Sequence, residues 1–139
     1  MRNLEHYLAA ILSDNIGKLI LRLALGSLML FHGYKKFMHG IDGVIHLVVK
    51  AGFPEALAYG VYLGEIVMPI MIILGFYTRI SSFFYAFTMG FAIYLISYPH
   101  FFNLNAKTGA LMIETPLLFM SGALALMFLG AGKFSIDKR

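Results

Sequence analysis

The stretch of residues 18–37 constrains this chain most, because its twenty residues are almost wholly apolar. A helix of about 20 apolar residues crosses the ~30 Å hydrocarbon core of a bilayer. Basic side chains interrupt the stretch near both ends, with Arg22 near its start and His32, Lys35 and Lys36 near its end. Ionisable residues inside a membrane span are costly and commonly functional. We therefore expect the rest of the chain to pack around this helix and to supply its countercharges.

The composition is that of a membrane protein rather than a soluble domain. Of the 139 residues, 60% are hydrophobic and 13% are charged, and the mean hydropathy is +0.79. Soluble domains average roughly 45–50% apolar and 25% charged residues. We predict one all-α domain over residues 1–139, an integral membrane four-helix bundle. Its predicted spans are residues 18–38, 55–76, 80–98 and 110–129.

Two further segments lie outside these spans. Before the first span, the spacing of the apolar residues predicts a short amphipathic helix at the membrane interface. These residues are Leu4, Tyr7, Leu8, Ile11 and Leu12. Residues 41–53 are too short to cross the bilayer, and we expect a connector on the outer face with one or two helical turns.

Charge and cysteine content exclude several classes of function. The net charge is +4, but the 11 Lys and Arg residues are scattered, with no run that could form a phosphate-binding patch, so we expect no nucleic acid partner. The chain has no cysteine, which removes disulfides, Cys-ligated iron–sulfur clusters and c-type haem. His32 alone is deep, so we expect neither haem nor a metal centre. A redox role would need a bound quinone or flavin, or a partner protein.

The second span holds an acidic residue near its middle, Glu65, followed four residues later by Pro69. Pro69 has no N–H for the carbonyl of Glu65, so we expect a kink there. Gly60 and Gly64 form a small-xxx-small step that allows close approach of another helix. The turn at residues 77–79 is very short, which makes spans two and three antiparallel neighbours.

Five residues of the first span form one stripe along the helix. Arg22, Gly26, Met29, Gly33 and Lys36 recur at steps of four, three, four and three. At 3.6 residues per turn, such steps keep them on one face. The glycines leave room for a close neighbour or a small ligand.

The depths of the charged residues suggest how they pair. Arg22 lies roughly 8 Å from the bilayer centre, within reach of Glu65 near the middle of the second span. Glu114 lies at a depth similar to that of His32 and Lys36. The simplest pairing is Arg22 with Glu65, and His32 or Lys36 with Glu114. Arg22 could instead snorkel to the headgroups. His32 suits either hydrogen-bonded packing or proton transfer, because its unperturbed pKa is about 6.5.

Several short motifs, in this order, resemble the family of DoxX-like membrane proteins. They are HGYKKF at residues 32–37, GFP at 52–54, GE at 64–65, LGFYTR at 74–79 and GAGKFSID at 130–137. No single motif is specific, but together they cover nearly the whole of residues 18–137.

The resemblance implies a four-helix protein of the bacterial inner membrane. Some relatives are linked to quinone-dependent thiosulfate oxidation, and others to membrane oxidoreductase complexes in oxidative-stress defence. By motif position, the resemblance makes His32, Lys36 and Glu65 candidates for a small-molecule or proton site, and Asp137 a structural end-cap. Glu114 joins the candidates because of its depth. Pro69 departs from the small residue that the family pattern has there.

The orientation follows from the basic residues. An even number of spans places both termini on one side. Six Lys or Arg residues lie at the termini and the 77–79 turn, and four lie in the opposite loops, with Arg22 left out as intramembrane. The positive-inside rule then predicts cytoplasmic termini.

Two functions remain open after these observations. The first is a quinone-linked oxidoreductase accessory subunit with a polar intramembrane site. The alternative is a non-enzymatic protein that binds a small molecule or lipid, or assembles other membrane proteins. Transport is a third, for which four helices without an inverted repeat would have to dimerise. The expected partners are the lipid bilayer, a quinone or redox subunit, and a second copy of the chain.

Overall fold

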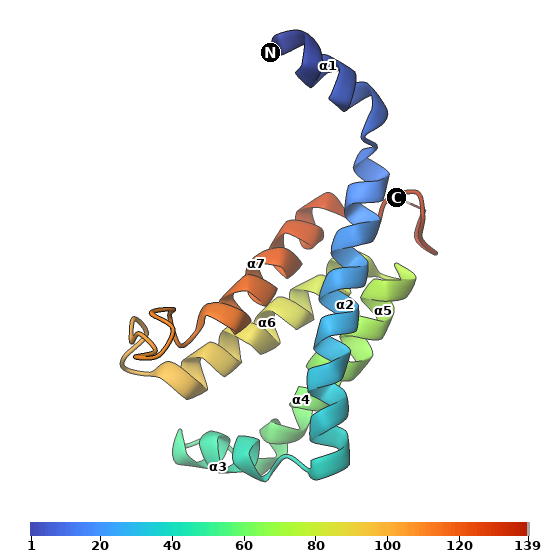
Figure 1. The fold of residues 1–139 in the computed structure, drawn as a ribbon. Coiled ribbons are helices and arrows are strands. Elements are labelled where there is room, and N and C mark those ends of the chain that lie inside the picture. Colours follow the sequence, from blue (N-terminus) through green and yellow to red (C-terminus); the bar gives the residue numbers. More distant parts are fainter. Residues whose placement is uncertain (139) are drawn as a thin grey trace.

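The computed structural model describes residues 1–138, which fold into helices joined by turns (Figure 1). Within this part of the chain, three helices are long and apolar enough to cross a membrane: α2 (Asp14–His39), the helix Glu55–Leu74, and α6 (Thr78–Ser97). A fourth, α7 (Glu114–Leu129), is apolar but has 16 residues. The predicted all-α fold class, with the long apolar helices of a membrane bundle, is confirmed.

The helices pack as two pairs. α2 packs along α5 (Met68–Leu74), which is the last part of the Glu55–Leu74 helix. α6 and α7 form an antiparallel hairpin that leans across the first pair, and α6 also contacts α5 (Figure 1). The two pairs diverge toward the end that holds α3 (Asp42–Lys50), so the bundle is splayed at that end (Figure 1).

The predicted N-terminal amphipathic helix is present as α1 (Arg2–Ile11). It projects away from the bundle, and all of its residues are exposed (Figure 1). Ser13 separates it from α2 by capping the start of that helix, where its hydroxyl accepts a hydrogen bond from the N–H of Asn15 at 3.2 Å. The cap explains why α2 begins before residue 18, the predicted start of the span.

The second span is regular only in its last part. It consists of a 3-10 segment (Glu55–Tyr59), α4 (Gly60–Tyr62), a π-helical turn (Leu63–Val67) and α5. The π turn comes just before Pro69, and the N–H of Met68 bonds the carbonyl of Leu63, five residues back. A proline inside a span is tolerated through such local adjustments. The helix ends at Leu74 rather than at the predicted residue 76, because Gly75 adopts a left-handed φ of 69°.

The fourth span begins at Glu114, four residues later than predicted. The residues before it are held in a loop instead: Leu104 and Leu111 form an antiparallel bridge, and the N–H of Asn105 bonds the carbonyl of Ala110 at 2.8 Å. These loop bonds use backbone groups that a helix from residue 110 would need. The first turn of the predicted span is therefore loop.

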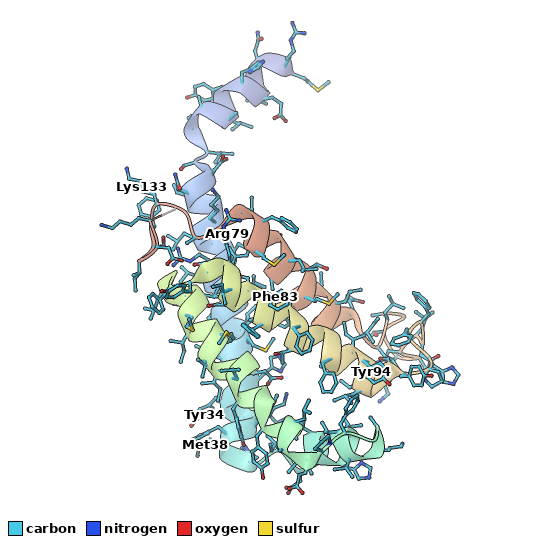
Figure 2. All side chains as sticks on the ribbon, turned by 180° about the vertical axis from the view of Figure 1, so that it is seen from behind. Tyr34, Met38, Arg79, Phe83, Tyr94 and Lys133 are labelled. Carbon is cyan, nitrogen blue, oxygen red and sulfur yellow. The ribbon has the colours of Figure 1, made fainter. Side chains whose placement is uncertain are left out.

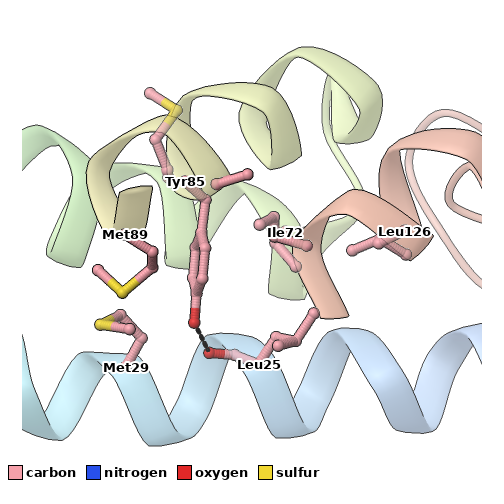
Figure 3. Packing of buried hydrophobic residues seen from close by; sticks show 9 residues of the cluster. Leu25, Met29, Ile72, Tyr85, Met89 and Leu126 are labelled. Carbon is pink, nitrogen blue, oxygen red and sulfur yellow. Dashed lines mark hydrogen bonds between the residues drawn. The ribbon is translucent and has the colours of Figure 1, made fainter. Parts of the chain in front are cut away.

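Side chains from four helices make the main core (Figure 3). Leu25 and Met29 of α2 meet Tyr85 of α6, which is fully buried and donates its hydroxyl to the carbonyl of Leu25 at 3.0 Å (Figure 3).

The glycines of the predicted α2 stripe bring α2 and the Glu55–Leu74 helix together. A Cβ on Gly26 would lie 2.9 Å from the carbonyl oxygen of Pro69, and one on Gly33 would lie 2.5 Å from that of Glu65. The stripe is confirmed as the packing face of α2.

The connector between the first two spans is the short helix α3, as expected from its length. Val48 is buried in it and joins Ile41 and Ala58 in a second, smaller apolar cluster. Partly buried residues of α6, Phe91 and Leu95, pack on this cluster. α3 is thereby held against the splayed end of the bundle.

Candidate functional site

An apolar cavity of about 330 Å³ lies between α3, the first half of the Glu55–Leu74 helix, and α6. Ligand pockets of roughly 300–1,000 Å³ are typical, with mostly apolar walls and a few polar groups. Among the residues that the structure describes, the charged side chains in this wall are Lys36 and Glu65. Thr88 also lines it, but its hydroxyl already donates to the carbonyl of Phe84 at 2.9 Å.

Lys36 and Glu65 form an ion pair in the cavity wall, with Nζ and Oε1 2.6 Å apart. The side chain of Glu65 is 5% exposed and that of Lys36 is 31% exposed. The second carboxylate oxygen, Oε2, is buried and has no hydrogen-bond partner among residues 1–138. A buried acceptor without a donor is uncommon in folded proteins and calls for an explanation.

Local sequence explains why these two residues meet. Gly33 lies against the backbone of Glu65, and Lys36 follows it by three residues on the same face of α2. Glu65 sits in the π turn Leu63–Val67, the irregular part of its helix. Such turns are frequent at functional sites. The close approach of the two backbones puts the lysine stem within reach of the carboxylate.

The predicted ion pair between Arg22 and Glu65 is wrong. Arg22 is 1% exposed, so it does not snorkel to the headgroups either. Its guanidinium donates to four backbone carbonyls, those of Ile72 (2.8 Å), Ile73 (2.6 Å), Ala131 (3.1 Å) and Phe134 (2.6 Å). The first two lie in the last turn of α5, where helix carbonyls lack intrahelical donors and the dipole favours a cation. These carbonyls satisfy the guanidinium at the narrow end of the bundle, far along α2 from Lys36.

The predicted pairing of His32 or Lys36 with Glu114 is also wrong. Lys36 bonds Glu65, and Glu114 is the exposed first residue of α7. His32 is exposed and its ring meets that of Phe119 edge-on, with centroids 6.0 Å apart. Neither His32 nor Glu114 lines the cavity. Of the four candidate residues, the structure brings together Lys36 and Glu65.

The C-terminal tail closes the opposite end of the bundle. Asp137 accepts hydrogen bonds from the N–H groups of Tyr77 and Thr78, at 3.0 and 2.9 Å, at the start of α6. The end-cap that the resemblance implied for Asp137 is therefore confirmed. Arg79 caps α7 in turn, by donating to the carbonyls of Met127 and Phe128 at 2.8 and 2.7 Å. Figure 2 shows Arg79 and Lys133 at this end, and Tyr34 and Met38 at the other.

Sequence reasoning missed the part of the cavity wall that α3 supplies. Three of the wall residues, Val44, Leu47 and Val48, belong to α3, which the sequence presented as a connector. The sequence feature that could have indicated this wall is the apolar face of the short segment, which is buried against α6. Without the position of α6, that face does not distinguish a packed helix from one lying at the membrane surface.

Comparison with known proteins decides the family. The family model DoxX matches residues 17–98, the region from α2 to α6 that holds both Lys36 and Glu65. This chain belongs to the DoxX family. It is a DoxX family membrane protein with three candidate membrane-spanning helices.

Two relatives of this DoxX protein are informative. It is 30% identical over 105 residues to a Bacillus subtilis (strain 168) protein named "Putative oxidoreductase CatD", across 76% of this chain and 78% of that one. It is 31% identical over 148 residues to an uncharacterized protein of Haemophilus influenzae, across 100% of this chain and 97% of the other. No solved structure gives a significant match.

Proposed function

We propose that this DoxX protein is a quinone-binding accessory subunit of a membrane oxidoreductase. The observation that carries the proposal is the apolar cavity with the Lys36–Glu65 ion pair in its wall. A quinone ring is flat and apolar, with oxygens at its edge. The ammonium of Lys36 has three donors, of which one bonds Glu65, so others remain for a quinone oxygen. The name of the Bacillus subtilis relative agrees with a redox role.

The proposal divides protons and electrons between subunits. Reduction of a quinone takes up two electrons and two protons. A carboxylate and an ammonium at the ring edge can bind and pass protons, but they carry no electrons. We therefore propose that electrons come from or go to a partner subunit or a second bound cofactor, and that Glu65 serves the protons.

We also propose the bacterial inner membrane as the location, with cytoplasmic termini. The start of α2, the turn between α5 and α6, and the C-terminal tail lie at one end of the bundle (Figure 1). Among residues 1–138, five Lys or Arg residues belong to this end and four to the opposite end, with Arg22 left out as intramembrane; Arg139, which the sequence count also assigned to the first group, lies outside the described residues. The cavity, near the other end, would then lie in the outer half of the bilayer.

A non-enzymatic lipid-binding role is the second candidate. Phe84 and Phe87 line the cavity and are 43% and 63% exposed, so the wall reaches the outer surface of the bundle. In a bilayer this surface meets lipid, and an acyl chain could enter the cavity there. The same cavity would then hold a lipid without any redox chemistry.

A binding experiment separates the two. We expect the detergent-purified protein to bind decylubiquinone in isothermal titration calorimetry. Lys36→Met should weaken binding about tenfold or more, because it removes a charge-assisted hydrogen bond. Lys35→Met, the matched control on the neighbouring exposed residue, should bind as the wild type.

Glu65→Gln tests the proton role in cell membranes. Its amide oxygen can still accept the hydrogen bond of Lys36, but an amide does not take up and release protons as a carboxylate does. Quinone-dependent activity should therefore be lost with membrane abundance unchanged. Glu5→Gln on α1 is the control. Loss of activity and abundance together would indicate a structural ion pair. Co-purification of phospholipid alone, with no binding of decylubiquinone, would favour the lipid-binding role.

A further inference from the structure

The unsatisfied oxygen of Glu65 points to the chemical form of the ligand. Oε1 accepts from Lys36 at 2.6 Å, whereas Oε2 has no donor among the residues that the structure describes. Glu65 is 4% exposed, so bulk water does not compensate for the missing partner. An ionised carboxylate accepts hydrogen bonds through both oxygens.

Neighbouring hydroxyls of the protein are already engaged elsewhere. Thr88, in the cavity wall, donates to the carbonyl of Phe84 at 2.9 Å. Tyr85, one turn of α6 earlier on the core side, donates to the carbonyl of Leu25 at 3.0 Å (Figure 3). With these hydroxyls engaged, a molecule in the cavity can supply the donor that Oε2 lacks.

We propose that the cavity binds the hydroquinone form of its ligand in preference to the quinone form. This inference rests on the proposed function. A hydroquinone carries hydroxyl groups, one of which can donate to Glu65 while its oxygen accepts from Lys36. A quinone oxygen can only accept, so it would meet Lys36 but leave Oε2 without a donor. The terminal torsion of a glutamate is soft, so the carboxylate can turn Oε2 toward a ring in the cavity.

A matched pair of ligands isolates the hydroxyl. 4-Nonylphenol and its methyl ether, 4-nonylanisole, have the same ring and tail, but only the phenol has a hydrogen-bond donor. We expect the detergent-purified wild type to bind the phenol at least about tenfold more tightly, as for a charge-assisted hydrogen bond. Decylubiquinol, measured without oxygen, should likewise bind more tightly than decylubiquinone.

The double variant Lys36→Met/Glu65→Leu is the control for the protein. It removes both charges together, and such apolar replacement of a buried ion pair is often tolerated. We expect it to bind phenol and anisole equally.

The outcomes separate this inference from the proposed function. Equal affinities in the wild type, or a phenol preference that survives in the double variant, would overturn the selectivity and leave quinone binding standing. If neither pair of ligands bound at all, the proposed quinone site would fail as well.

Discussion

Arg22 shows how a single buried charge can be accommodated without a carboxylate. Its guanidinium joins the last turn of α5 to the C-terminal tail through four backbone carbonyls. Only an arginine has donors spread over a planar fork wide enough for such an arrangement. Arg22 is therefore a structural residue, and the candidate site depends on it only through the fold.

Replacing Arg22 with lysine should destabilise the protein by about 2–4 kcal/mol, because several buried carbonyls lose their charged donor. Thermal unfolding in detergent, followed by helical circular dichroism, measures the change. The matched control is Arg79→Lys, since Arg79 is exposed and its two carbonyls can turn to water. Equal, small effects in both variants would contradict the structural role of Arg22.

At the scale of elements, the contact of α2 with the irregular second span sets the geometry of the site. Gly33 lies against the π turn. Lys36 follows Gly33 by about one helical turn of α2, which brings its ammonium to Glu65 in the π turn. The second glycine of the span's small-xxx-small step, Gly64, approaches Thr88 of α6 closely, whereas Gly60 has open space around it. Gly60 lines the cavity, so only half of the predicted step serves helix packing.

A Gly33→Ala substitution should lower stability by about 1–3 kcal/mol, because its Cβ would lie 2.5 Å from the carbonyl oxygen of Glu65. Gly17→Ala is the matched control on the same helix. Its Cβ meets nothing within 4 Å, and alanine favours the helix, so it should stabilise by up to about 1 kcal/mol. Both are measured by thermal unfolding in one detergent. A neutral Gly33→Ala would show that the backbones are not in close contact.

At the scale of the whole molecule, the proposed orientation is open to a direct test, because the chain has no cysteine. Lys133→Cys places one thiol in the C-terminal tail, and Lys107→Cys places one in the opposite loop. In spheroplasts, a membrane-impermeant thiol reagent should label the Lys107→Cys variant at once. It should label the Lys133→Cys variant only after permeabilisation. The reverse pattern would place the termini outside and contradict the charge-based orientation.

The candidate site illustrates which kinds of feature can be predicted from sequence. The burial and pairing of Glu65 followed from its depth in an apolar span, and the α2 stripe followed from helical periodicity. The partner of Glu65 did not follow. Arg22 and Lys36 lie on the same face of α2, and the relative shift of two helices along their axes decided between them.

By itself, the sequence determined the all-α fold class, the long apolar spans, the DoxX family and the end-cap by Asp137. These features depend on composition, on local periodicity and on motifs that are contiguous in the chain. The tertiary structure alone decided that Lys36 pairs with Glu65, that backbone carbonyls satisfy Arg22, and that α3 encloses a cavity. These features depend on how far each helix shifts and tilts against its neighbours, which no local pattern encodes.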